Sequence, residues 1–210
     1  MTSQRTRNRM IERLRQQGIR NEFVLSAMAA VPRHIFVEEA FAHRAYEDMA
    51  LPLGLGQTIS QPYIVARMIE LLLAGRKGLG KTLEVGAGCG YQASVLAELT
   101  TEVYAIERIK PLIEKAKQNL RTIQQLKVRL KYADGHEGLP EAAPFDTIIL
   151  AAATSHVPQS LLQQLALGGR MLMPLGSAEQ HLLLIERTAT AYIESRLDAV
   201  RFVPLLPGIE

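Results

Sequence analysis

Three glycines stand at alternate positions directly after a short apolar segment. The segment spans 82–85, and the glycines are Gly86, Gly88 and Gly90. Glycine is needed where the backbone takes a positive φ or approaches a ligand closely, so three glycines within five residues are typical of a binding turn. The pattern predicts a strand that turns sharply into a helix over a nucleotide-like ligand.

The residues around this glycine turn narrow the choice of ligand. A phosphate-binding loop would continue with Lys and Ser or Thr, whereas Tyr91, Gln92 and Ala93 follow here, which argues against phosphoryl transfer. The spacing also fits the G-x-G-x-x-G dinucleotide pattern badly. Glu84 lies just before the turn. A carboxylate in that place suits a cationic ligand better than a pyrophosphate.

Two further apolar segments also end in a carboxylate. Segment 102–107 ends at Glu107, and segment 128–133 is followed by Asp134 and Gly135. An acid about 20 residues beyond a glycine turn lies at the tip of the neighbouring parallel strand, where it can accept hydrogen bonds from ribose hydroxyls. Asp134 would then face an adenine edge. Each acid alone could be a helix cap or a loop residue, but their joint placement at strand ends favours a nucleoside site.

The chain divides into a helical front and an alternating back. The Arg-rich stretch 3–17 predicts an amphipathic helix with a basic, solvated face, and 21–31 predicts a second helix. Strands and helices alternate from about residue 79, which predicts an α/β, Rossmann-like fold: a mostly parallel seven-stranded sheet with an N-terminal helical extension. We expect segments 1–78 and 79–210. The expected elements of the second are strands 82–85, 102–107, 128–133, 145–150 and 170–175, helices 91–99, 110–123 and 158–167, and an antiparallel hairpin of 181–187 with 196–204.

Composition is that of one enzyme-sized unit. The chain has 210 residues, 48% of them hydrophobic, and a net charge of only +3, which does not by itself indicate a nucleic-acid partner. The one cysteine, Cys89, permits no internal disulfide, fits a reducing compartment, and is interpreted as a packing residue. The five histidines lack metal-ligand spacing. Because no 18-residue apolar run exists, we expect a cytoplasmic protein without membrane contact.

A stretch rich in Gly, Pro and hydroxyl residues spans 46–63. It is too long for a connector and unsuited to a core element, which predicts a functional loop. Ser60 stands near its end, just before a helix predicted over 62–73. In isolation, Ser60 or Thr58 could simply cap that helix.

These residues together resemble the protein-L-isoaspartate (D-aspartate) O-methyltransferases over nearly the whole chain. The specific matches are PRHIFV at 32–37, LGLGQTISQP at 53–62, the glycine turn at 83–91, AIER at 105–108, Asp134 with Gly135, and VRFVPL at 200–205. The segment QTISQP at 57–62 is far more specific than the glycine turn, which all Rossmann-like methyltransferases share. One departure is AAATS at 151–155, where the family usually has a proline, so the turn there is expected to differ in shape.

The resemblance implies S-adenosylmethionine as cofactor, S-adenosylhomocysteine as its product, and isoaspartyl or D-aspartyl residues of damaged proteins as substrate. The enzyme would esterify the free carboxylate, and the ester would collapse to a succinimide without enzyme, which begins repair. A carboxylate is already ionised at neutral pH, so no general base is required. Catalysis would come from orientation and exclusion of water.

The resemblance also implies a role for each site residue. Ser60 would be catalytic, holding the substrate carboxylate by its hydroxyl. The cofactor would contact Thr58 and Ile59, which close over it, Gly86, Gly88 and Gly90 along its methionine part, Glu107 at the ribose, Asp134 and Gly135 at the adenine, and Glu84 at the ammonium or as a loop anchor. The substrate peptide would pair as an extra strand with Arg201, Phe202, Val203 and Pro204.

Other functions are weighed against this one. Nucleic-acid methylation is disfavoured, because the chain lacks the Asp or Asn followed by Pro-Pro-Tyr that grips a flipped base and has no second cysteine. A small-molecule acceptor stays open. A non-catalytic cofactor-binding module would tolerate any change at Ser60, and the fold alone cannot decide this. We expect a monomer.

Overall fold

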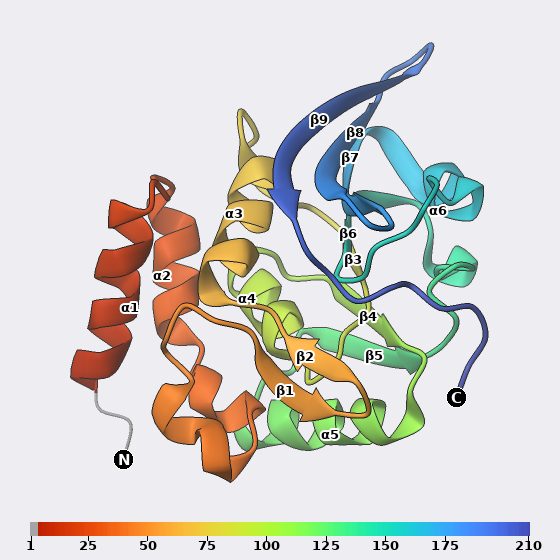
Figure 1. The fold of residues 1–210 in the computed structure, drawn as a ribbon. Coiled ribbons are helices and arrows are strands. Elements are labelled where there is room, and N and C mark those ends of the chain that lie inside the picture. The colour runs from red at the N-terminus through yellow and green to blue at the C-terminus, as the bar shows by residue number, and fades with distance from the viewer. Residues whose placement is uncertain (1–3) are drawn as a thin grey trace.

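The computed structural model describes residues 4–210 and has a seven-stranded sheet at its centre (Figure 1). The strand order is β5-β4-β3-β6-β7-β8-β9, with β3 to β7 parallel and the last two antiparallel. This confirms the predicted Rossmann-like class. The strands are β3 (Thr82–Val85), β4 (Val103–Glu107), β5 (Val128–Tyr132), β6 (Phe145–Leu150), β7 (Leu165–Gly176), β8 (Gln180–Arg187) and β9 (Tyr192–Val200).

Helices cover both faces of this sheet, and two hydrophobic cores result. Successive strand residues point to opposite faces, so Ile148 and Met171 enter one core while Ile149 and Leu172 enter the other. The larger core lies under the helices that precede and follow β3, and the smaller one lies under α6. The helices are α1 (Gln4–Gln16), α2 (Glu22–Ala30), α3 (Pro62–Leu73), α4 (Tyr91–Leu99), α5 (Lys110–Thr122) and α6 (Gln159–Gln164), with short 3-10 turns η1 (Arg33–Phe36), η2 (Glu39–Arg44) and η3 (Pro140–Ala142).

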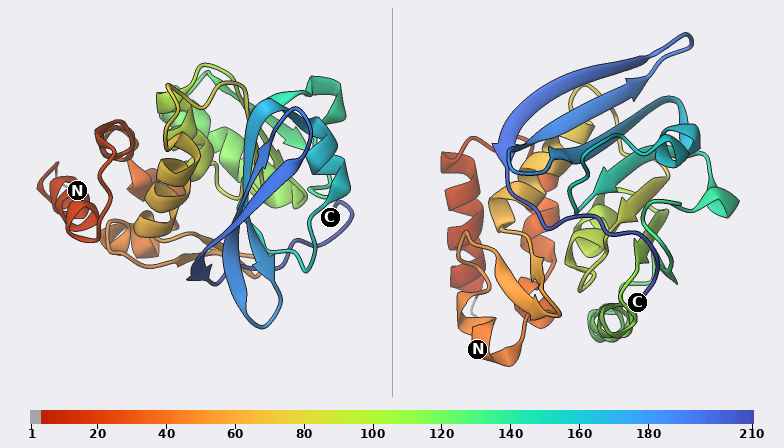
Figure 2. Two further views of the ribbon diagram at one scale, coloured as in Figure 1. Left: turned by 90° about the horizontal axis from the view of Figure 1, so that it is seen from above. Right: turned by 45° about the vertical axis from the view of Figure 1, so that its right-hand side comes forward.

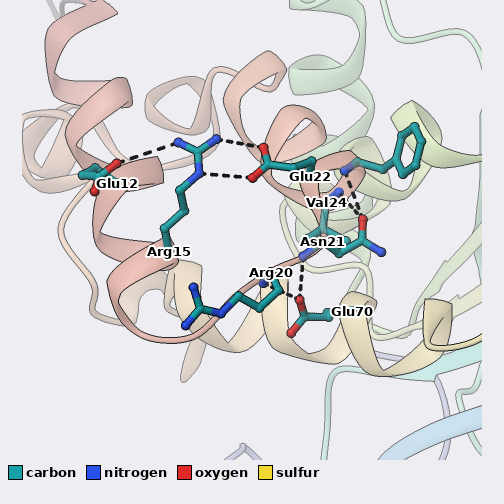
Figure 3. Close-up of polar contacts among 8 residues, drawn as sticks. Glu12, Arg15, Arg20, Asn21, Glu22, Val24 and Glu70 are labelled. Carbon is teal, nitrogen blue, oxygen red and sulfur yellow. Dashed lines mark hydrogen bonds and ion pairs between the residues drawn. The ribbon is translucent and has the colours of Figure 1, made fainter.

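The N-terminal helices are fastened to α3 by polar contacts (Figure 3). Asn21 caps α2, since its side chain accepts hydrogen bonds from two amides of the first turn. Glu70 of α3 accepts from the backbone amides of Arg20 and Asn21, at 2.7 and 2.8 Å. Arg15 pairs with Glu22 at 2.8 Å. The larger core contains residues from both predicted segments, so the division near residue 78 stays a prediction about chain organisation.

The predicted elements agree with the structure except near three boundaries. The first helix is seen from Gln4, and its predicted start at residue 3 lies outside the described residues. Helix α6 ends at Gln164 rather than 167, because Leu165 already pairs with Phe145 of β6 and begins β7. Strand β9 covers Tyr192–Val200 rather than 196–204, because this edge strand is mostly exposed and carries little apolar pattern. Figure 2 shows the β8–β9 hairpin projecting beyond the rest of the sheet.

The expectation that the stretch 46–63 is unsuited to a core element is wrong. It contains an antiparallel hairpin of β1 (Leu51–Gly54) and β2 (Gln57–Ile59). Leu51, Leu53 and Ile59 are buried, so the hairpin packs into the larger core. The hairpin turn at 54–56 has positive φ throughout, which glycine enters without cost at Gly54 and Gly56 but which Leu55, at 54°, also adopts.

Within residues 4–210, none of the helices combines the length and the apolar character that crossing a bilayer demands. The same residues contain no group of three or more His, Cys, Asp and Glu side chains that could hold a metal ion.

Candidate active site

A cleft opens at the carboxyl ends of β3 and β4, where parallel α/β sheets bind ligands. Its empty space is about 840 Å³, including the open mouth. The glycine turn forms one side and the β2–α3 connection forms another. The predicted site residues on its wall are Thr58, Ile59, Ser60, Glu84, Gly86, Gly88, Glu107, Gly135, Val203 and Pro204.

The glycine turn has the backbone conformation that its residue types predict. Gly86, Gly88 and Gly90 have φ of 88°, 54° and 86°, in the region that glycine enters without steric cost. The amides of Gly86 and Ala87 both donate to the carbonyl of Ile106, which ties the turn to β4. Gly90 does not line the cleft. It is the N-cap of α4, and a Cβ there would lie 3.4 Å from Ala116 Cβ of α5.

The carboxylate of Glu107 is fixed at the tip of β4. Oε2 accepts a hydrogen bond from the Gly88 amide at 2.8 Å, and Oε1 accepts from the Ile109 amide at 2.9 Å. Each carboxylate oxygen has a second lone pair, so Glu107 can also accept from a ligand in the cleft. Glu107 therefore links the glycine turn to the tip of β4, where the ribose is predicted to bind.

Glu84 is a buried acid with one oxygen left open. Oε1 accepts from Gln92 at 3.0 Å, whereas Oε2 has no hydrogen-bond partner within residues 4–210. Burial raises the pKa of Glu84 well above its ordinary value, and the nearby Glu107 raises it further. A buried carboxylate of this kind is stabilised by a cation. Since Glu84 lines the cleft, the site fits a ligand that brings an ammonium group to this wall.

Ser60 also lines the cleft, and its hydroxyl makes no hydrogen bond within residues 4–210. The alternative that Ser60 or Thr58 caps the following helix is wrong. The N-cap of α3 is Gln61, and the helix amide of Tyr63 is instead satisfied by Asp48, whose Oδ1 accepts at 2.8 Å. The Ser60 hydroxyl is therefore available to a ligand.

Asp134 and Gly135 differ in their placement. Gly135 lines the cleft, and a Cβ on it would lie 2.7 Å from Val85 and 2.8 Å from Leu205, so only glycine fits there without a shift. Asp134 lies off the cleft wall, because its carboxylate accepts from the amides of His136 and Gly208. Asp134 thus holds the C-terminal segment over the strand ends, and direct contact with an adenine stays a prediction.

The C-terminal segment crosses the carboxyl ends of the strands (Figure 1). The amide of Ala153 donates to the carbonyl of Val203, and the amide of Leu205 donates back to Ala153. The stretch 151–155, where a proline was expected from the resemblance, thus forms a short parallel bridge to Pro204. Val203 and Pro204 line the cleft, whereas Arg201 and Phe202 line a neighbouring groove.

Cys89 has the environment of a packing residue. It is buried, and burial raises the pKa of its thiol to about 11, so the thiol is protonated at neutral pH. Its carbonyl accepts a hydrogen bond from Asn119 of α5 at 3.0 Å. Asn119 supports the glycine turn from behind, and sequence reasoning missed it because nothing in a helix pattern shows such a distant partner.

Arg33 is a second residue whose role the sequence did not reveal. It is fully buried, and it donates to the carbonyl of Ser60 at 2.8 Å. The motif at 32–37 drew attention to it, but its hydrogen-bond acceptors are backbone carbonyls, which leave no mark on the sequence.

The fold and the cleft together define a class I, S-adenosylmethionine-dependent methyltransferase: a mostly parallel sheet, a glycine turn, an acid at the tip of the next strand, and an open buried carboxylate. Two solved structures share this fold over 94% of the chain. One is a protein-L-isoaspartate O-methyltransferase, with a TM-score of 0.86 and 27% identity, and the chain spans 65% of that solved chain. The other is the Plasmodium falciparum beta-aspartate methyltransferase (PCMT) in complex with S-adenosyl-L-homocysteine, with a TM-score of 0.83, 25% identity and 96% of that chain covered.

Sequence comparison identifies the family. The model of the protein-L-isoaspartate(D-aspartate) O-methyltransferase family matches residues 4–209. The protein-L-isoaspartate O-methyltransferase of Dechloromonas aromatica is 72% identical over 100% of this chain and 97% of its own length. That of Aromatoleum aromaticum is 62% identical over 99% and 95%. The chain therefore belongs to the protein-L-isoaspartate(D-aspartate) O-methyltransferase family, whose members are enzymes with S-adenosylmethionine as methyl donor.

Proposed function

We propose that this chain transfers a methyl group from S-adenosylmethionine to the free carboxylate of L-isoaspartyl residues, in the cleft between Ser60 and the glycine turn. One observation carries the proposal. Ser60, whose hydroxyl is free, and Glu84, whose buried Oε2 has no partner within residues 4–210, line the same cleft, so an acceptor anion and a donor cation have separate partners in one site.

The donor side of the cleft, which consists of Glu84, the glycine turn, Glu107 and Gly135, binds the cofactor. Glu84 binds the ammonium group of the cofactor, for which its unpartnered Oε2 provides the acceptor. The turn at Gly86 and Gly88 lies along the methionine part, and Gly90 shapes the turn from behind. Glu107 accepts from the ribose hydroxyls, and Gly135 borders the adenine with Asp134 supporting the segment above it. Thr58 and Ile59 close over the cofactor from the hairpin.

The acceptor side needs little more than correct placement. The bound cofactor supplies an electrophilic methyl group on a sulfonium. The isoaspartyl carboxylate is ionised at neutral pH, so one of its oxygens can attack the methyl carbon without loss of a proton. As the O–CH3 bond forms, the S–CH3 bond would break, and its electron pair would leave with the sulfur as the neutral thioether of S-adenosylhomocysteine. The Ser60 hydroxyl donates a hydrogen bond to that carboxylate and aims it. Orientation and exclusion of water then supply the rate acceleration.

The substrate backbone lies along the segment from Arg201 to Pro204. The Val203 amide makes no hydrogen bond within residues 4–210, so it can donate to a substrate carbonyl in the manner of an added strand. Phe202 cannot do so as it stands, because its amide and its carbonyl are both bound by Gln180, at 2.6 and 3.2 Å. Val203 therefore offers a free amide to the substrate, whereas Phe202 does not.

The wider setting follows from the same proposal. The enzyme acts as a cytoplasmic monomer on damaged proteins and peptides, accepts D-aspartyl residues as a secondary substrate, and has no nucleic-acid or membrane partner. A net charge of +3 and a single buried cysteine are compatible with that setting.

The test is transfer of labelled methyl to two peptides that differ only in isoaspartate against aspartate. We expect labelling of the isoaspartyl peptide alone, released by base as methanol. In Ser60→Ala, kcat should fall roughly 10- to 100-fold, because a hydrogen bond to a charged group contributes about 1.5–3 kcal/mol. Ser26→Ala, which changes an exposed serine of α2, is the matched control.

Equal labelling of both peptides would contradict the substrate assignment. Labelling of neither peptide, with S-adenosylhomocysteine still bound, would contradict it as well and point to a small-molecule acceptor. A Ser60→Ala protein as fast as the native one would refute the role of Ser60 alone.

A further inference from the structure

Arg33 is a cation buried without an anionic partner. Its exposed fraction is 0%, and it makes no ion pair with any carboxylate in residues 4–210. Burial lowers its pKa, but a guanidinium stays protonated in proteins. Desolvating an unpaired charge costs several kcal/mol, so such a residue is destabilising unless its hydrogen bonds compensate.

The partners of Arg33 are two backbone carbonyls and one ring. Nε donates to the carbonyl of Ala45 at 2.7 Å, and Nη2 donates to that of Ser60 at 2.8 Å. The guanidinium carbon lies 4.7 Å from the ring centre of Tyr91. Ala45 precedes the β1–β2 hairpin and Ser60 follows it, while Tyr91 is the first residue of α4 after the glycine turn.

From these contacts we propose that Arg33 is a positioning residue for methyl transfer. It joins Ala45 and Ser60, which flank the β1–β2 hairpin, to each other and to Tyr91 at the start of α4. In this way it sets the distance between Ser60 and the glycine turn. This inference rests on the proposed role of Ser60. Arg33 itself does not line the cleft, so it acts on the aim of the acceptor carboxylate and not on the affinity for either substrate.

The chemistry of the side chain explains why an arginine is needed here. Its planar fork presents several N–H groups in fixed directions and also stacks on an aromatic ring, so one group can serve two carbonyls and Tyr91 at once. A lysine has a single compact ammonium group, which would reach the carbonyl of Ala45 or that of Ser60 but not both. Methionine would fill the space but hold neither carbonyl. We therefore expect Arg33→Met to impair the positioning of Ser60 more than Arg33→Lys does.

The experiment is a double-mutant cycle with Ser60. The proteins are Arg33→Lys and Arg33→Met, each in the native background and in the Ser60→Ala background. The measurements are kcat on an isoaspartyl peptide, the Kd of S-adenosylhomocysteine, and Tm. Arg13→Lys is the control, because Arg13 also donates to a carbonyl at the start of the same segment, that of Tyr46 at 3.2 Å, but does not reach Ser60.

We expect Arg33→Met to lower kcat about 10- to 100-fold, since a misplacement of about 1 Å can cost that much. Arg33→Lys should lose less and keep the native fold if Arg33→Met does not fold. The Kd of S-adenosylhomocysteine should stay within about twofold of native. In the Ser60→Ala background either change should lower kcat by less than about twofold, because coupled residues are not additive.

Three results would overturn the inference. The first is an Arg33 effect of the same size with and without the Ser60 hydroxyl. The second is a native kcat in Arg33→Lys. The third is a loss of kcat matched by an equal loss of cofactor affinity, which is the mark of a purely structural role. If Ser60→Ala itself has native kcat, the proposed role of Ser60 fails first, and this inference fails with it.

Discussion

The two sides of the cleft are built in opposite ways. The donor side is buried and rigid: Glu107 is bound by two backbone amides, and the glycine turn is tied to β4. The acceptor side consists of Ser60, which follows the β1–β2 hairpin, and the C-terminal segment, and it offers a free hydroxyl at Ser60 and a free amide at Val203. The cofactor is always the same molecule, so a wall fixed by hydrogen bonds can bind it. The substrates share one carboxylate but differ around it, so they need free hydrogen-bonding groups on a backbone that is held in place.

The comparison predicts that a change at Glu84 affects donor binding most strongly. Glu84→Gln keeps the shape but removes the negative charge and replaces one acceptor oxygen by an NH2 group that can only donate, so an ammonium loses its partner. We expect the affinity for S-adenosylhomocysteine to fall roughly 10- to 100-fold, because a hydrogen bond to a charged group is worth about 1.5–3 kcal/mol. Isothermal titration calorimetry measures this. Glu98→Gln, at the exposed end of α4, is the control, and an unchanged affinity in Glu84→Gln would place the ammonium elsewhere.

A smaller effect is expected from the backbone of the glycine turn. Gly90→Ala puts a side chain at a φ of 86°, which costs roughly 1–2 kcal/mol for an L-residue. Thermal unfolding should show a Tm lower by about 2–8 °C in a chain of this size. Gly78→Ala is the matched control, because Gly78 has no positive φ and open space around it. Equal Tm values for the two variants would show that the turn is not conformationally strained by a side chain.

The smallest expected effect is on how the stabilisation by S-adenosylhomocysteine depends on pH, and it arises from Glu84 on the donor side alone. Because burial raises the pKa of Glu84, the free folded protein keeps its proton to higher pH than the unfolded chain. That contribution to stability is complete below the unfolded pKa and is lost as pH rises through the folded one. A cation bound beside Glu84 favours the ionised form, so the stabilisation by S-adenosylhomocysteine should grow with pH.

Thermal shifts with and without S-adenosylhomocysteine, measured from pH 5 to about pH 8, test this pH dependence. Glu84→Gln should remove the growth with pH, while Ser60→Ala should keep it. A growth with pH that persists in Glu84→Gln would assign the titration to another group.

Sequence reasoning recovered the donor side better than the acceptor side, and the reason is physical. A positive φ demands glycine and a strand tip shows its acid, so the turn at Gly86 and the acid Glu107 are visible in local patterns. The hairpin at 51–59 was missed because Pro52 and its glycines are typical of loops, although Leu51 and Leu53 alternate as strand residues do. The contacts of Arg33 depend on backbone groups far along the chain, and no local pattern records them.

The same limit applies to Asp134. Its position after β5 is the one that a nucleoside-binding acid would take, but its carboxylate is bound by the amide of Gly208, 74 residues further on. Placement at a strand end could be predicted from the sequence, whereas the partner that the side chain chooses there depends on the path of the C-terminal segment.

The most direct test of the division between the two sides measures binding and transfer in the same three proteins: native, Ser60→Ala and Glu84→Gln. Calorimetry gives the Kd of S-adenosylhomocysteine, and labelled methyl transfer to an isoaspartyl peptide at saturating S-adenosylmethionine gives kcat. We predict that Ser60→Ala binds the cofactor product as the native protein does but transfers slowly, while Glu84→Gln binds weakly yet regains most of its rate at saturation. If Ser60→Ala weakened cofactor binding as much as Glu84→Gln does, the two sides would not be separate, and the account would be contradicted.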